Sequence, residues 1–197
     1  VVATLFGLLN GFMIAKLGLP PFIATLGSQM ISMGIGSIIT KVQAQTWPAA
    51  SAEIGGWFKK ALVRTKVFDI IPIGAIWLLV FFIIAALILH KSKFGRYLYA
   101  IGSNEEAARV SGVNVLATIV GTFMIAGALY GYTGFVEAAR LGSSTATLGL
   151  NYESDAIAAV VIGGVSFVGG TGKISGVILG VFMMQLIMSG MTFLGIS

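Results

Sequence analysis

The sequence contains no cysteine and a single histidine, His90, among its 197 residues. The absence of cysteine excludes disulfides, thiolate nucleophiles and cysteine-ligated metals. One histidine cannot form a histidine pair for zinc. Because His90 lies among basic residues at the end of an apolar run, the sequence offers no Ser-His-Asp triad either. We therefore expect no enzymatic activity, no metal site and no cofactor bound by this chain.

Charged residues are also scarce, at 10% of the chain, whereas a soluble domain carries about a quarter. Apolar residues make up 57%, the mean hydropathy is +0.98, and uncharged runs cover residues 70–89, 116–136 and 174–197. A helix needs about 20 apolar residues to cross a bilayer, and its backbone groups must be bonded internally there. The sequence predicts an all-α, polytopic transmembrane helical bundle, forming one membrane domain over residues 1–197.

The ends and the net charge add two expectations. Val1 already lies in an apolar run without the charged segment of a signal peptide, and the last residues continue another such run. We expect a fragment of a longer protein, truncated at both ends. The net charge of +5 is explained by Lys and Arg in loops, and gives no indication of nucleic-acid binding.

Several segments depart from a plain membrane span. The loop 41–69 is hydrophilic, and its residues 51–60 could form a short interfacial helix with tryptophans at headgroup level. Residues 141–153 predict an irregular segment. Residues 156–172 are uncharged but short and broken by glycines, which favours a re-entrant or half-spanning helix facing protein or a cavity.

Glycines at four-residue spacing predict close helix contacts. They include Gly127 with Gly131, and the ladder of Gly172, Gly176 and Gly180. The sequence allows two roles for several other residues. They either pack or start a helix, or they line a translocation path. These residues are Gln29, Asp155, Gly163, Gly164 and Gln185.

The short string Gly170-Thr171-Gly172-Lys173 superficially suggests a phosphate-binding loop. That motif requires a glycine five positions before the Gly-Lys pair and Ser or Thr after it. Phe167 and Ile174 occupy those positions, so the sequence excludes a nucleotide site of this kind.

The polar stretch 94–115 lies between two uncharged runs and encodes a short helix of its own. Ser103 and Glu106 have the spacing of a capping box, with Ser103 at the N-cap. Glu105 adds a second negative charge at the helix start, Arg109 lies in the last turn, and Gly112 is placed for the C′ position. A helix of about two turns, roughly 10 Å, is marginal alone, so we expect it to dock into a partner.

These residues carry a family resemblance. The pattern Glu106-Ala107-Ala108-x-x-x-Gly112 resembles the EAA-type loop by which permeases of ATP-binding-cassette importers engage their ATPase. The surrounding residues, and blocks such as 21–27, 139–142 and 155–164, are similar to the monosaccharide branch of these permeases (ribose, xylose, galactose type). The residues assigned to ATPase coupling are Gly95, Arg96, Gly102, Asn104, Glu105, Glu106, Ala107, Ala108, Arg109 and Gly112.

The resemblance implies a multi-pass subunit of a sugar importer in the bacterial inner membrane. It implies four kinds of partner: an ATPase that binds ATP and Mg²⁺, a second permease subunit in a homodimer, an extracytoplasmic sugar-binding protein, and membrane lipid. Lys and Arg are equally numerous on the two sides of the predicted spans, so the positive-inside rule does not choose an orientation. The resemblance places the coupling loop, residues 90–115, on the cytoplasmic side.

The sequence leaves two other functions open. A secondary carrier or channel for a small polar solute would need no ATPase, although the spans contain no deeply placed charge of the kind that ion coupling uses. A purely structural membrane subunit would have no translocation path. Which sugar a permease would carry depends on pocket geometry and on the separate binding protein.

Overall fold

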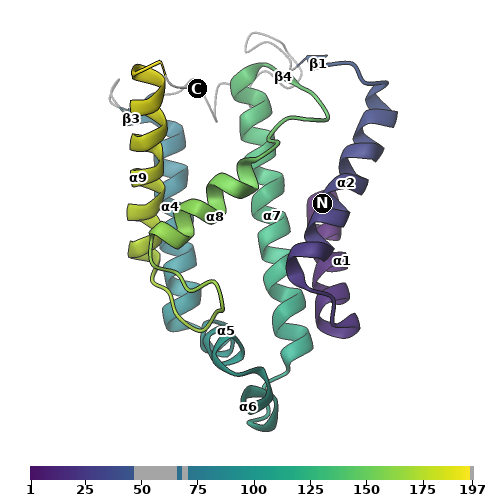
Figure 1. Cartoon of the computed structure of the whole chain (residues 1–197), viewed down its shortest axis with the longest axis vertical. Helices are drawn as coiled ribbons and strands as arrows, with labels where there is room; N and C mark the ends of the chain where they lie inside the picture. Colours follow the sequence, from purple (N-terminus) through teal and green to yellow (C-terminus); the bar gives the residue numbers. More distant parts are fainter. Residues whose placement is uncertain (47–65, 68–70, 196–197) are drawn as a thin grey trace. The chain divides into compact units, whose positions relative to one another are not determined.

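The structure, a computed structural model, describes residues 1–46, 66–67 and 71–195. Figure 1 shows its ribbon. The contacts divide the chain into two compact units. The first unit contains residues 1–81 and 116–148, and the second contains residues 82–115 and 149–197. The predicted interfacial helix at 51–60 lies outside the described residues.

The first unit contains α1 (Val2–Leu17), α2 (Pro21–Thr40), the first part of α4 (Ile73–Lys91) and nearly all of α7 (Val115–Leu141). Gly18 ends α1 in the left-handed conformation, with φ of 67°. Pro21 then opens α2, where the missing N–H of proline costs nothing because the first helical amides have no partner. The break between α1 and α2 is therefore encoded locally.

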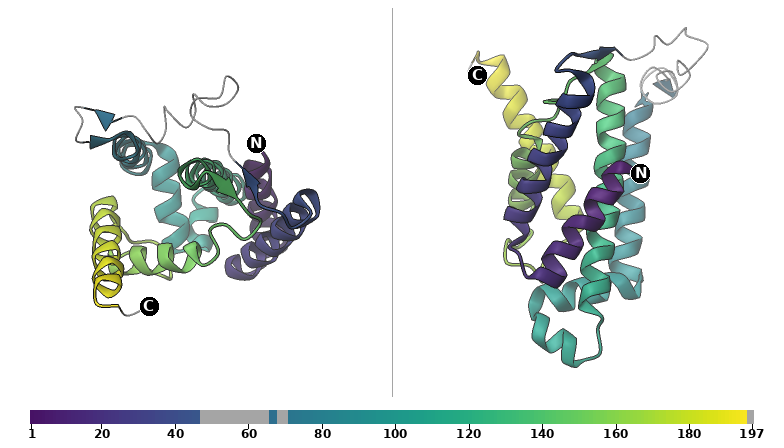
Figure 2. Two further views of the ribbon diagram at one scale, coloured as in Figure 1. Left: turned by 90° about the horizontal axis from the view of Figure 1, so that it is seen from above. Right: turned by 90° about the vertical axis from the view of Figure 1, so that its right-hand side faces the viewer.

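Glycines bring α1 and α7 into backbone contact (Figure 2). A Cβ on Gly7 would overlap the carbonyl of Phe123 and lie 3.3 Å from the Cα of Gly127. A Cβ on Gly127 would overlap the carbonyl of Ala3. The predicted close-approach face of Gly127 is confirmed, and its partner is the glycine face of α1.

Aromatic side chains join α4 to α7 within the same unit. The ring centroids of Phe81 and Tyr132 lie 4.9 Å apart, and those of Trp77 and Tyr132 lie 6.3 Å apart. Tilted ring pairs at these separations are favourable. Large rings thus fill the space between α4 and α7, whereas small residues allow α1 to approach.

Short strands connect the loops of the first unit. β1 (Gln45–Thr46) pairs antiparallel with β4 (Ser143–Ser144), and β2 (Lys66–Val67) pairs with β3 (Ile71–Pro72). The 141–153 segment is irregular as predicted, except for β4 and the first residues of α8. α7 continues beyond the uncharged run 116–136, and on this extension Glu137 and Arg140 form a 2.7 Å ion pair one turn apart, as their spacing predicts.

The second unit combines the end of α4 with α5 (Lys93–Ser103), α6 (Glu105–Val110), α8 (Tyr152–Ile162) and α9 (Ile174–Phe193). The uncharged segment 156–172 is not one helix. α8 begins earlier, at Tyr152, and ends at Ile162, because Gly164 takes a φ of 79° and closes the helix. Its eleven residues span about 16 Å, half of a bilayer's hydrocarbon, which agrees with the half-spanning prediction.

Helices α8 and α9 pack backbone against backbone. A Cβ on Gly180 would overlap the carbonyl of Ala159, and one on Gly176 would overlap the carbonyl of Gly163. Gly176 and Gly180 of the predicted ladder therefore pack against α8, whereas Gly172 precedes α9 and a Cβ there would lie 3.1 Å from the side chain of Val165.

Four helices in the described residues are long and apolar enough to cross a membrane: α2, α4, α7 and α9. Few of their side chains are buried within the chain. Apolar helices that expose their side chains suit a lipid environment, and the all-α membrane bundle predicted from the sequence is confirmed.

Candidate functional site

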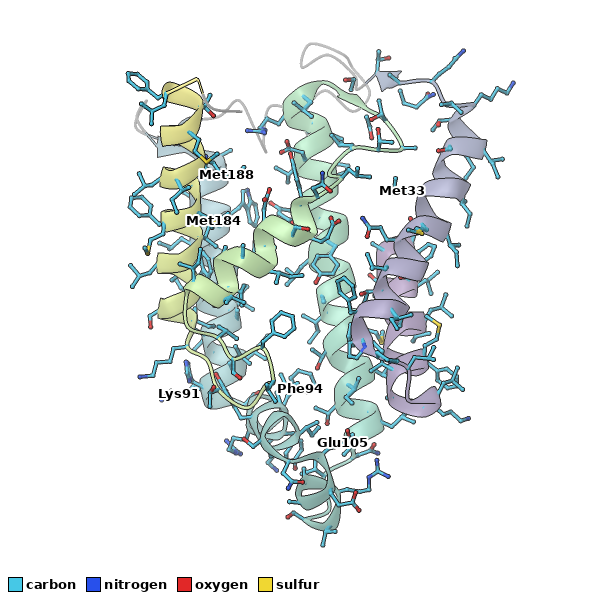
Figure 3. The ribbon with its side chains drawn as sticks, in the orientation of Figure 1. Met33, Lys91, Phe94, Glu105, Met184 and Met188 are labelled. Atoms are coloured by element: carbon cyan, nitrogen blue, oxygen red, sulfur yellow. The ribbon has the colours of Figure 1, made fainter. Side chains whose placement is uncertain are left out.

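The candidate site begins where α4 turns into α5. Ser92 caps α5: its hydroxyl accepts a 3.0 Å hydrogen bond from the amide of Gly95 and donates to the carbonyl of Ile88. Gly95 packs so tightly against the end of α4 that a Cβ there would overlap the carbonyl of Leu89. The predicted site residue Gly95 thus permits the sharp turn, which Lys91 and Phe94 flank (Figure 3).

One residue, Asn104, separates α5 from α6. Its backbone is extended, its N–H donates to the carbonyl of Ala100, and its Oδ1 accepts a 2.9 Å bond from the amide of Ala107. The prediction of Ser103 as the N-cap is wrong by one position. Ser103 is still helical as the last residue of α5, so the side chain that reaches the first turn of α6 is the amide of Asn104.

The acidic start of α6 lies on the surface. Glu105 and Glu106 occupy the first turn and are exposed. Carboxylates there interact favourably with the free amides and the positive end of the helix dipole. Glu105 also accepts a 2.9 Å bond from Arg109 one turn later, with both side chains more than half exposed.

Gly112 closes α6 as the sequence predicts. It has a φ of 83°, its N–H donates to the carbonyl of Arg109, and the N–H of Val113 donates to the carbonyl of Ala108. These two bonds define a Schellman motif with glycine at C′. The short helix therefore has a defined beginning and end.

The two alanines of α6 face opposite environments. Ala108 is buried, with 4% of its surface exposed, whereas Ala107 is exposed. Val110 is 84% exposed. The surface available to a partner thus combines the two glutamates with Ala107 and Val110, rather than an alanine pair.

The loop between α8 and α9 contacts α5, a relationship that the sequence does not reveal. The hydroxyl of Tyr99 donates a 2.9 Å hydrogen bond to the carbonyl of Gly172. A Cβ on Gly102 would overlap the amide of Gly170, so the two backbones touch. This contact explains why the predicted site residue at position 102 is a glycine.

A cavity of about 280 Å³ lies beside this contact. The exposed surface of its wall is almost entirely apolar. Its apolar lining comes from Leu89, Leu98, Val160, Val165, Ile174 and Val177.

The residues for which the sequence allows either helix packing or the lining of a translocation path belong to both units. Gln29 is half-buried on α2 in the first unit, while the others lie in the second. Asp155 is in the first turn of α8, Gly163 touches α9, and Gln185 is exposed on α9, 3.4 Å from Ser189. Arg96 is exposed on α5. Among the described residues, no three His, Asp or Glu side chains form a group that could hold a metal.

Comparison with known proteins adds an independent observation. A family model described as "Branched-chain amino acid transport system / permease component" matches residues 1–197. The galactose/methyl galactoside import permease protein MglC of Haemophilus influenzae is 40% identical over 200 residues, covering 100% of this chain and 58% of that protein. The ribose import permease protein RbsC of Escherichia coli K12 is 36% identical, covering 97% of this chain and 58% of that protein.

RbsC of Bacillus subtilis 168 is 38% identical, over 95% of this chain and 56% of that protein. The chain thus spans less than three-fifths of the length of these relatives. No solved structure matches it.

Proposed function

The chain belongs to the family of branched-chain amino acid transport system permease components, and from this membership we propose that it serves as the membrane-spanning subunit of an ATP-driven sugar importer. The relatives at 36–40% identity carry names that specify import of galactose, methyl galactoside or ribose. The proposed cargo is accordingly a monosaccharide or a simple glycoside. The chain itself would perform no catalysis.

The observation that carries this proposal is the construction of α6. It is a six-residue helix, capped at one end by Asn104 and at the other by Gly112, and it presents an exposed acidic turn beside an exposed valine. Such a helix has too few residues to be stable by itself. A groove on a partner protein would stabilise it, and the chemistry of this surface suits a partner with basic and apolar groups.

In this proposal the partner is an ATPase that binds ATP and Mg²⁺, and α6 is the coupling helix on the cytoplasmic side of the bacterial inner membrane. A second copy of the permease completes the path, and an extracytoplasmic binding protein delivers the sugar. A force on α6 is passed to the spans only if the helix keeps its shape. Its two caps provide that rigidity.

The test is ATPase capture by the complete permease carrying Glu106→Lys. Reversing this exposed charge should weaken ATPase co-purification and sugar uptake while leaving membrane insertion intact. Lys41→Glu is the matched control, because Lys41 is an exposed loop residue on the first unit. If both variants retain the ATPase as the wild type does, the coupling role of α6 is wrong.

The alternative, a carrier or channel without an ATPase, makes the opposite prediction in cells. Its uptake would survive ATP depletion and collapse with the ion gradient. A structural subunit without a path would instead show no protection by sugar of cysteines introduced along the spans. This chain contributes no native cysteine that would react with such labels.

A further inference from the structure

We propose that Tyr99 and Gly102 of α5 are positioning residues that attach the α8–α9 hairpin to the coupling helix α6. This inference rests on the proposed function, since it concerns how movement of α6 reaches the membrane. The contact between α5 and residues 169–172 of the loop is called the clasp below. Figure 1 shows the loop between α8 and α9 reaching α5.

The first component of the clasp is a directed hydrogen bond. Tyr99 and Gly172 are 73 positions apart, and the hydroxyl of Tyr99 donates to the carbonyl of Gly172 at 2.9 Å in a partly buried setting. Gly172 immediately precedes Lys173, the N-cap of α9. The bond therefore holds the point at which α9 begins.

The second component is backbone contact without intervening side chains. A Cβ on Gly102 would overlap the amide of Gly170, and a Cβ on Gly170 would lie 2.9 Å from the Cα of Ser103. Gly169 and Gly170 both have positive φ, at 102° and 75°, which side chains disfavour. Close packing of this kind transmits displacement, because it leaves no space for a side chain to absorb it.

The loop itself is internally bonded. The amide of Ser166 donates to the carbonyl of Thr171 at 3.0 Å, and the amide of Gly169 donates to the carbonyl of Ser166 at 3.2 Å. At the α8 side, the amides of Gly164 and Val165 complete a Schellman motif with the last turn of the helix. The loop is thus a closed structure rather than a slack connection.

Both ends of this connection are stiff. Asn104 alone links α5 to α6 and is bonded into both helices, so α6 cannot move far without the end of α5. On the other side, α8 and α9 touch through Gly163 and Gly176, which makes the hairpin a single body. The clasp joins these two stiff parts.

The experiment compares Tyr99→Phe with Tyr97→Phe in the complete importer, reconstituted with its ATPase and binding protein. Tyr97 lies on the same helix but is 39% exposed, which makes it the matched control. Tyr99→Phe should retain ATPase association and ATP hydrolysis but lower the sugar transported per ATP by about fivefold, the factor expected for one neutral hydrogen bond. Tyr97→Phe should preserve the wild-type ratio.

Gly102→Ala provides a second test, with Gly190→Ala as its control because a Cβ on Gly190 would meet no atom within 4 Å. Gly102→Ala should reduce transport per ATP further than Tyr99→Phe. Wild-type ratios in both clasp variants would overturn the proposal, and so would equal losses of transport and hydrolysis. Failure of the wild-type permease to bind an ATPase would instead overturn the proposed function.

Discussion

The backbones of Gly163 and Gly176 touch where α8 ends and α9 begins. A Cβ on either residue would overlap the carbonyl oxygen of the other. In a membrane, where apolar lipid competes with apolar side chains, contact between helices depends on such close packing. The α8–α9 hairpin is therefore stabilised by a backbone contact that only residues without side chains permit.

Gly176→Ala should destabilise the complete protein, although alanine is the better helix former. Overpacking of a tight contact costs about 1–3 kcal/mol. The measurement is the midpoint of thermal unfolding in detergent. Gly190→Ala on the same helix has open space around it and should leave the midpoint unchanged or slightly raised; equal midpoints for the two variants would contradict the packing role.

Gly127→Leu should disrupt the contact of α7 with α1 in the first unit. The new side chain would collide with the backbone of Ala3 and Gly7, which cannot retreat as a flexible side chain would. Gly134→Leu, on the same helix with open space around it, is the control. We expect a lower thermal midpoint for the first variant alone, and an unchanged midpoint would show that α1 is not needed there.

Asn104→Ala should loosen the first turn of α6, because loss of an N-cap costs about 0.5–2 kcal/mol. In the wild type the amide of Ala107 donates to Asn104, so faster hydrogen exchange of this amide would show that the first turn has loosened. Asn104→Asp keeps an accepting oxygen and should preserve protection. Ser103→Ala should also leave this amide protected. Loss of protection in that variant would instead show that Ser103 is the N-cap.

Gly112→Pro should reduce ATPase co-purification and sugar uptake, because proline fixes φ near −65° where the structure has 83°. Gly112→Asn should be milder, since asparagine tolerates the left-handed conformation. Co-purification and uptake in membrane vesicles measure both effects. Normal ATPase binding by the proline variant would mean that the closure of α6 is irrelevant to the partner.

Arg109→Ala should change helix stability little. Its ion pair with Glu105 is more than half exposed on both sides, and exposed pairs one turn apart contribute about 0.3–0.5 kcal/mol. Hydrogen exchange of α6 should be near that of the wild type. Any large loss of ATPase binding in this variant would then arise from the contact surface, whereas a melted helix would show that the pair is structurally essential.

The sequence predicted those features whose cause lies within a few residues. The C′ glycine of α6 lies at a fixed distance from the helix start, so the sequence predicts Gly112 correctly. The uncharged runs 70–89, 116–136 and 174–197 predict three of the four long helices, α4, α7 and α9. The cap was misplaced from Asn104 to Ser103 because serine and asparagine both suit the position. The position at which α5 ends determines which of the two residues caps α6, and α5 ends at Ser103.

The remaining features depend on contacts between distant segments. Neither Tyr99 nor Gly172 carries a local signal of their hydrogen bond, which joins residues 73 positions apart. The glycines of 163–172 suggested a break in a helix but not its partner. The family resemblance alone indicates Gly102, and only the three-dimensional structure shows that its backbone contacts Gly170.

The junction at Asn104 has a mechanical consequence. A single residue offers two soft torsions, here at φ of −161° and ψ of 106°. On its other side α6 is followed by residues 111–114 before α7 begins at Val115, a connection with several torsions to share any rotation. Because Asn104 is hydrogen-bonded into both helices, these two torsions are held, and a push on α6 is delivered first to α5 rather than through the longer connection toward α7.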